Sequence, residues 1–144
     1  MAKLTLKVSY DYDFTLLAIV ASCRIYKLCW HLNKLLKLQL SKQNDIEVAD
    51  KEKRQMDYFD NYLYLDENQQ ISYQIIANKC RDGLFIPELK KIDYLFLIKG
   101  DTYKSPIIES LKELPIIELI SETLPGQLKS AYKLLVIEQI KTAP

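Results

Sequence analysis

The carboxylates Glu88 and Asp93 are the two residues whose spacing comes nearest to a chemical site. They stand five positions apart where Pro87 fixes the backbone, so we expect a defined corner that leads into a strand. Across that turn the two carboxylates could approach each other and hold a cation, or accept a lysine or arginine of a partner. The structural alternative is that Asp93 caps backbone N–H groups and Glu88 pairs with Lys90 or Lys91, as carboxylates at turns usually do.

Tyrosine is the aromatic residue that the chain uses most, with ten copies against four phenylalanines and one tryptophan. Tyr58, Tyr62 and Tyr64 share one face of a predicted strand, and Tyr73 lies on the neighbouring strand. Such rings could form a protein-binding surface, or they could stack the bases of single-stranded RNA. The alternative is ordinary strand composition. A formal net charge of +1 and the lack of an RNA-binding motif argue against nucleic acid.

Cys23 stands near the predicted start of a helix, whose dipole gives this thiol a physical reason for a lowered pKa. A half-buried core cysteine is the alternative. His31 is the single histidine, and Cys29, two residues away on a helix, points elsewhere, so we predict no metal site. Three isolated glycines cannot form a phosphate-binding loop. We therefore predict no catalytic residues and no cofactor.

The composition is that of an ordinary globular protein, with 144 residues, 49% hydrophobic and 27% charged. This length suits a single domain over residues 1–144. The longest apolar run, residues 16–21, is far shorter than the ~20 residues of a membrane helix, and residues 1–7 lack a signal pattern. An odd number of cysteines without a CxxC motif suits a reducing compartment, so we expect a cytoplasmic protein.

Hydrophobic periodicity predicts the secondary structure. Alternation or short apolar runs indicate strands at residues 3–9, 14–21, 94–99 and 116–123, and a hairpin with arms at 58–65 and 70–78. A helical stripe runs from Ile25 to Leu36, with Ser22 as the candidate N-cap and Trp30 at the border of the polar side. Further helices are expected from Ser105 and at 127–140, where a strand at 134–137 is the alternative. Residues 43–55 are expected to form an exposed connection.

These elements predict an α+β fold, a two-layer sandwich with two or three helices on one face of a mixed, mostly antiparallel sheet. The strand, helix and strand between residues 94 and 123 are expected to form a C-terminal βαβ unit, with its two strands parallel in one sheet.

Residues 86–94, with the sequence IPELKKIDY, are similar to the signature of the IPExxxVDY family of bacterial proteins, which occur mainly in the Bacteroidota. The chain departs from that signature only in having Ile92 in place of valine. Compatible stretches at residues 11–14, 32–33, 76–79 and 128–130 extend the resemblance along the whole chain. The resemblance implies a small stand-alone bacterial protein and brings no activity with it.

Three hypotheses about function follow. The first is a non-catalytic protein that binds a protein partner, or a second copy of itself, through an aromatic or strand-edge surface. The second is a small-molecule binder or enzyme with a pocket near the βαβ unit, where Glu88, Asp93 or Asp101 would be polar anchors. The third is RNA binding through the tyrosine-rich hairpin.

Overall fold

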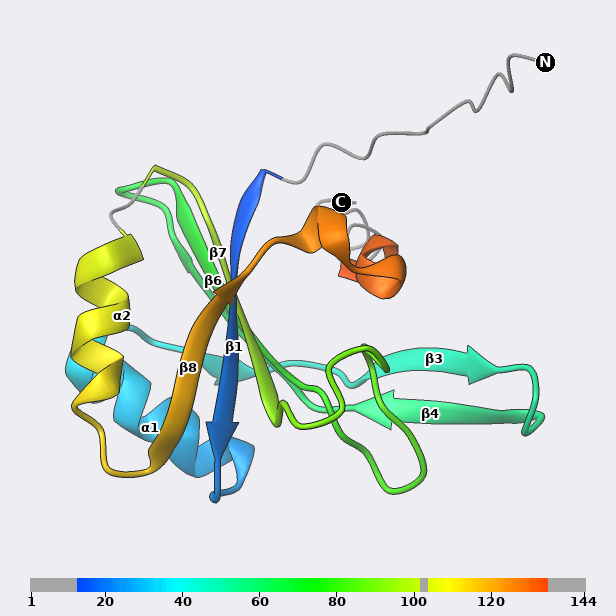
Figure 1. Cartoon of the computed structure of the whole chain (residues 1–144). Helices are drawn as coiled ribbons and strands as arrows, with labels where there is room; N and C mark the ends of the chain where they lie inside the picture. Colours follow the sequence, from blue (N-terminus) through cyan, green and yellow to red (C-terminus); the bar gives the residue numbers. More distant parts are fainter. Residues whose placement is uncertain (1–12, 102–103, 135–144) are drawn as a thin grey trace, which may run out of the picture.

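The computed structural model describes residues 13–101 and 104–134 of the chain. Its main feature is a six-stranded sheet in the order β2-β5-β6-β7-β1-β8, in which every described pairing is antiparallel (Figure 1). A separate two-stranded ribbon, β3–β4, projects away from this sheet. The elements are β1 (Phe14–Ala21), α1 (Ile25–Leu36), β2 (Ser41–Lys42), β3 (Ile46–Asp50), β4 (Gln55–Phe59), β5 (Asn61–Asp66), β6 (Ile71–Ala77), β7 (Tyr94–Lys99), α2 (Lys104–Lys112) and β8 (Ile117–Thr123), followed by 3-10 turns at Pro125–Gln127 and Lys129–Ala131.

The predicted α+β class is confirmed, and so are the elements with the strongest periodicity. The strand β1 has the predicted bounds, and α1 covers the predicted helical stripe. The strands β7 and β8 both pair with β1 in antiparallel fashion, so they are parallel to each other, as the βαβ prediction requires. They are not direct neighbours, because β1 lies between them.

Three local predictions were wrong. Residues 43–55 are not a plain exposed connection, because they contain β3, whose Ile46 and Val48 pack against the core. The first hairpin arm is divided, since Tyr58 belongs to β4 and β5 begins at Asn61. The N-cap of α1 is Arg24 without a side-chain cap, and the hydroxyl of Ser22 donates to Glu118 instead. The predicted strand at residues 3–9 and the end of the closing segment at 135–140 lie outside the described residues.

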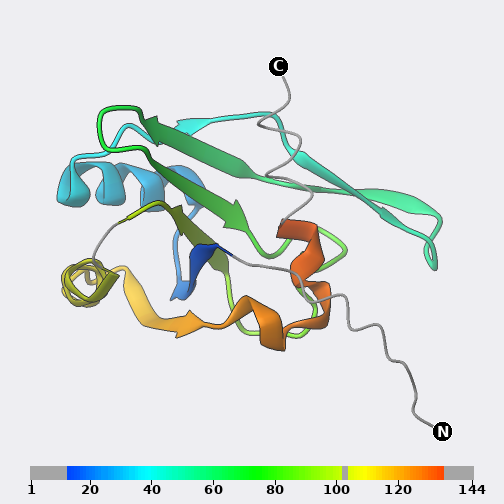
Figure 2. The same ribbon diagram turned by 90° about the horizontal axis from the view of Figure 1, so that it is seen from above.

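The sheet separates two hydrophobic cores, because successive strand residues point to opposite faces. On one face, α1 and α2 share a core with Ile19, Ile75 and Phe96 of β1, β6 and β7, and α2 packs mainly against β8. On the other face, Leu16, Ile76 and Leu95 are covered by the loop between β6 and β7 and by the C-terminal segment. Figure 2 shows the helices on one side of the sheet and the 3-10 turns on the other. No helix within the described ranges is long and apolar enough to cross a membrane.

The turn after β7 depends on Gly100, whose φ of 132° is one that other residues rarely adopt. A Cβ added at this position would lie 2.7 Å from the carbonyl oxygen of Gln70. We expect Gly100→Ala to lower the free energy of unfolding by about 1–3 kcal/mol. Urea denaturation followed by circular dichroism measures this change. Gly126→Ala is the matched control, because nothing lies within 4 Å of its added Cβ, and a similar loss in both variants would contradict the account.

Candidate functional site

The outward side of α1 carries the two aromatic side chains with the highest exposed fractions among the described residues. Tyr26 is 62% exposed and Trp30, one helical turn later, is 57% exposed. The inner side of the same helix is apolar and packs on the sheet through Ile25, Leu28, Cys29 and Leu32. Because the buried stripe already anchors α1, the fold itself does not require the two exposed rings to be aromatic.

Trp30 is held in place by its neighbours on the helix. The ammonium group of Lys34 lies 5.1 Å from the centre of the indole ring, which is a cation–π distance. The His31 ring meets Trp30 edge-on, with ring centres 4.9 Å apart. These contacts restrict the indole before any partner arrives, so less conformational entropy is lost on binding.

The same side of the helix is strongly basic. Lys27, Lys34 and Lys37 are exposed beside the aromatic rings, and α1 contains no aspartate or glutamate. This local excess of positive charge is not apparent from the formal net charge of the whole chain, which is only +1. We call this surface the α1 outer face; it consists of Tyr26, Lys27, Trp30, Lys34 and Lys37.

A polar pocket of about 360 Å³ opens where α1 begins. Arg24 and Tyr26 line it, so the pocket adjoins the α1 outer face. Two ion pairs cross it: Lys79 lies 2.8 Å from Asp93, and Lys42 lies 3.8 Å from Asp60. Asp93 therefore lines a concave site, although the charged groups of the two ion pairs already neutralise each other.

The carboxylates Glu88 and Asp93 do not come together. Asp93 accepts a hydrogen bond from the backbone N–H of Ala21 at 3.0 Å and pairs with Lys79, so it ties the end of β1 to the loop before β7. Glu88 accepts hydrogen bonds from the backbone N–H and the hydroxyl of Ser130, both at 2.8 Å. The expected capping role of Asp93 is confirmed, whereas Glu88 bonds to Ser130 and not to Lys90 or Lys91. Both carboxylates have structural partners.

The Ser130 contact gives Glu88 a pH-dependent role. Burial raises the pKa of Glu88, but the hydrogen bonds from Ser130, a hydrogen bond from its own backbone and the charge of Lys133 together hold the pKa below its usual value. A carboxylate with a depressed pKa stabilises the fold above its unfolded pKa, and this contribution disappears as the pH falls through the folded value.

We therefore expect Glu88→Gln to cost about 1 kcal/mol or less at pH 7, since the residue is exposed, and still less at pH 3. Urea denaturation at the two pH values measures this difference. The exposed Glu113, replaced by glutamine, is the control. A cost for Glu88→Gln that is equal at both pH values would contradict the assigned role.

The thiol of Cys23 does not have the lowered pKa that its sequence position suggested. Burial raises its pKa, and this effect exceeds the lowering by Lys27. Burial also raises the pKa of Cys29 to about 12. The hydroxyl of Tyr94 donates to the carbonyl oxygen of Cys23. Neither thiol has the character of a nucleophile, because the thiolate is the reactive form.

The hairpin tyrosines do not form one exposed platform. Tyr58 is exposed on β4, whereas Tyr62 and Tyr64 are half-buried on β5 and pack against the helix-side core. The rings of Tyr64 and the buried Tyr73 stack with centres 6.1 Å apart. A binding role for Tyr58, Tyr62 and Tyr64 stays a prediction, but the three rings are dispersed.

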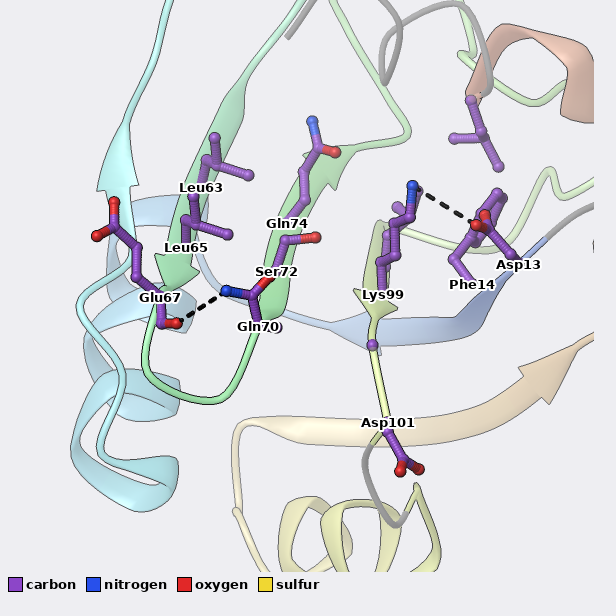
Figure 3. Close-up of a pocket in the computed structure, with 13 residues that line it drawn as sticks. Asp13, Phe14, Leu63, Leu65, Glu67, Gln70, Ser72, Gln74, Lys99 and Asp101 are labelled. Carbon is purple, nitrogen blue, oxygen red and sulfur yellow. Dashed lines mark hydrogen bonds and ion pairs between the residues drawn. The ribbon is translucent and has the colours of Figure 1, made fainter. Parts of the chain in front are cut away.

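A second and larger pocket, of about 640 Å³, lies on the sheet face opposite the helices (Figure 3). Phe14, Leu63, Leu65 and Leu97 make most of it apolar. Asp101 lines this pocket, Asp93 lines the polar one, and Glu88 lines neither. The three proposed polar anchors, Glu88, Asp93 and Asp101, therefore do not line one common pocket. Among residues 13–101 and 104–134, no group of three or more histidine, cysteine, aspartate or glutamate side chains could hold a metal ion.

No protein-family model matches the chain, and a search of curated proteins found no similar sequence. The resemblance of residues 86–94 to the IPExxxVDY signature therefore stays a prediction. In the structure this segment lies between β6 and β7 and runs into the start of β7, and three of its residues have structural roles: Ile86 is fully buried, Glu88 accepts hydrogen bonds from Ser130, and Asp93 accepts one from the N–H of Ala21 at the end of β1.

Proposed function

We propose that this protein is a non-catalytic binding protein that docks an acidic protein partner on the α1 outer face. The observation that carries the proposal is the exposure of Tyr26 and Trp30, one turn apart on a helix whose charged residues are all basic. Tryptophan and tyrosine are the residues most often found at the energetic centres of protein interfaces.

The basic residues indicate that the surface of the partner is negatively charged. Lys27, Lys34 and Lys37 would repel a basic surface and attract an acidic one, which raises the rate of association. The pocket at the start of α1 adds Arg24 at the edge of this surface. An acidic segment that placed apolar side chains on the two rings would satisfy both the charge and the aromatic character of the α1 outer face.

A non-catalytic role is supported by the character of the titratable groups. The thiols of Cys23 and Cys29 are shifted away from reactivity, and Glu88 and Asp93 are engaged in structural contacts. The proposal includes a cytoplasmic location, which the odd number of cysteines supports. It also includes kinship with the IPExxxVDY family, which the sequence of residues 86–94 supports.

Affinity capture with matched variants tests the proposal. The intact protein and a Tyr26→Ala/Trp30→Ala double variant are immobilised and exposed to lysate, and the retained proteins are identified by mass spectrometry. A control variant, Leu124→Ala/Tyr132→Ala, removes two similarly exposed large side chains that lie outside α1. We expect an acidic protein that the intact chain and the control retain, that the double variant loses, and that moderate salt releases.

Other outcomes would overturn the proposal. If the captured species is RNA, or a second copy of this chain, the α1 outer face has a different partner. If the double variant retains everything that the intact protein retains, the face is not the binding surface.

A further inference from the structure

The polar pocket at the start of α1 lies where several regular elements of the fold meet. Four of its lining residues stand at the ends of elements: Ala21 ends β1, Ala77 ends β6, Tyr94 begins β7 and Ile25 begins α1. Within the sheet Ala77 pairs with Tyr94, so this part of the wall is held by a strand ladder. A cavity of about 360 Å³ built in this way is pre-formed, and its volume is at the lower end of the range for small-molecule sites.

The charged side chains that line the pocket do not balance. Three are basic and two are acidic, namely Arg24, Lys42, Lys79, Asp60 and Asp93. The two ion pairs use both acids and two of the bases. The guanidinium group of Arg24 is left over, because it has no hydrogen bond or ion pair to any residue in 13–101 or 104–134. The lining therefore carries a net side-chain charge of +1, which attracts an anion.

Two further groups of the pocket can serve a ligand. Lys42 and Asp60 lie 3.8 Å apart with side chains that are 61% and 45% exposed, so their ion pair is weak and Lys42 can share its charge. The hydroxyl of Tyr62, which pairs with Lys42 between β5 and β2, has no hydrogen bond to a described residue. Burial raises the pKa of this hydroxyl, so Tyr62 keeps its proton and can donate it in a hydrogen bond.

The two aspartates determine which anion suits the pocket. A group with a single negative charge balances the net charge of +1, whereas a phosphate dianion would leave an excess of negative charge beside Asp60 and Asp93. A carboxylate also matches the planar fork of an arginine, from which it accepts two parallel hydrogen bonds. Ala21, Ile25 and the ring of Tyr26 give the wall an apolar part, which suits a ligand with an apolar body.

We propose that this pocket binds a small organic acid through a single carboxylate group, held by Arg24, Lys42 and the hydroxyl of Tyr62. This site is separate from the docking of a protein partner, because none of the three groups belongs to the α1 outer face. An acidic side chain of a docked protein carries the same chemical group, so the experiment uses one probe for each source.

NMR titration of the ¹⁵N-labelled chain tests the proposal, with sodium benzoate as the free acid and N-acetylglutamate N-methylamide as the acidic side chain. We expect benzoate to shift the amide signals of Tyr26, Lys42 and Tyr62 saturably, with a Kd on the order of 1 mM. Benzamide, which has the same shape without the charge, and inorganic phosphate should produce no saturable shift. Binding of the glutamate probe that is as tight as that of benzoate would assign the pocket to a protein side chain and overturn the proposal.

Substitutions identify the groups that hold the carboxylate. Arg24→Gln should raise the Kd for benzoate about tenfold, whereas Arg81→Gln, which replaces an exposed arginine outside the pocket, should leave it unchanged. Asp60→Asn should lower the Kd about threefold, because it removes a negative charge and releases Lys42. A general loss of structure would not tighten binding, so this variant separates a ligand site from a structural one.

Three results would overturn the proposal: no saturable shift with benzoate, equal binding of benzamide or phosphate, or weaker binding by Asp60→Asn. None of them bears on the α1 outer face, whose role is decided by partner capture with the Tyr26→Ala/Trp30→Ala variant.

Discussion

Replacing Asn78, the buried asparagine that directly follows β6, by alanine is expected to lower the free energy of unfolding by about 3–5 kcal/mol. The side chain is fully buried, with 0% exposure. Its amide nitrogen donates to the carbonyl oxygens of Leu89 and Ile92 at 2.8 and 3.0 Å, and its amide oxygen accepts from the N–H of Ile86 at 2.8 Å. Alanine would remove the side-chain partner of the Ile86 N–H and of the Ile92 carbonyl, whereas the carbonyl of Leu89 would still accept from the N–H of Ile92.

The backbone of Asn78 adds to this role. Its N–H donates to the carbonyl oxygen of Asp93, and its carbonyl oxygen accepts from the N–H of Phe85. Asn78 therefore joins the start of the loop between β6 and β7 to residues near the end of that loop. Phe85 and Ile86 of this loop cover the second core. Losing the side chain should loosen Phe85 and Ile86, which lie in that core.

Urea denaturation followed by circular dichroism measures the effect. The exposed Asn44, replaced by alanine, is the matched control and should change stability by about 0.5 kcal/mol or less. A loss below about 1 kcal/mol for Asn78→Ala would show that the loop holds its shape without this side chain.

Replacing Trp30 by alanine is expected to weaken binding of the proposed acidic partner by about 30-fold or more, which corresponds to about 2 kcal/mol. The indole is exposed in the free protein, so its loss should change the free energy of unfolding little. The cation–π contact with Lys34 disappears as well, which frees that ammonium group. Isothermal titration calorimetry with the purified partner gives the affinity.

The charge of the face should act mainly on the rate of association. Lys34→Glu is expected to slow association and to reduce its dependence on salt, whereas Trp30→Ala should mainly accelerate dissociation. The control is Tyr132→Ala, which removes an exposed tyrosine outside α1. Equal losses for Trp30→Ala and Tyr132→Ala would contradict a specific role for the α1 outer face.

The parts of the fold that the sequence predicted are those with a strong repeating pattern. The apolar run of β1 and the helical stripe of α1 are buried on the sheet along their length, so their periodicity reports packing directly. The strand β3 was missed because only Ile46 and Val48 alternate within a charged stretch, and its partner β4 lies outside the main sheet. A two-stranded ribbon needs fewer buried residues than a central strand.

The contacts of residues 86–94 could not be read from the sequence. Glu88 meets Ser130 across 42 positions of the chain, and Asp93 meets Ala21 across 72. No local pattern encodes such pairings. The role of Asn78 was missed for the same reason, since a buried asparagine in a loop has no periodicity to reveal it.

The α1 outer face was partly visible in the sequence. Tyr26 and Trp30 are four positions apart on the side where Lys27 and Lys34 lie, and this spacing places them together on any helix. The prediction located Trp30 at the border of the polar side, whereas the structure exposes it in the middle of a basic surface. The sequence could not show that this side of α1 stays exposed, because that depends on where the other elements pack. No described element covers it.

The most direct test of the binding surface uses Trp30 itself, because it is the single tryptophan of the chain. Protein labelled with 5-fluorotryptophan should give one ¹⁹F NMR signal from this position. For the free protein we predict a signal that is strongly sensitive to replacing H₂O by D₂O, as expected for an exposed ring. Addition of the acidic partner should shift the signal and remove this solvent sensitivity. A signal already insensitive to solvent in the free monomer, or one unchanged by a bound partner, would contradict the account.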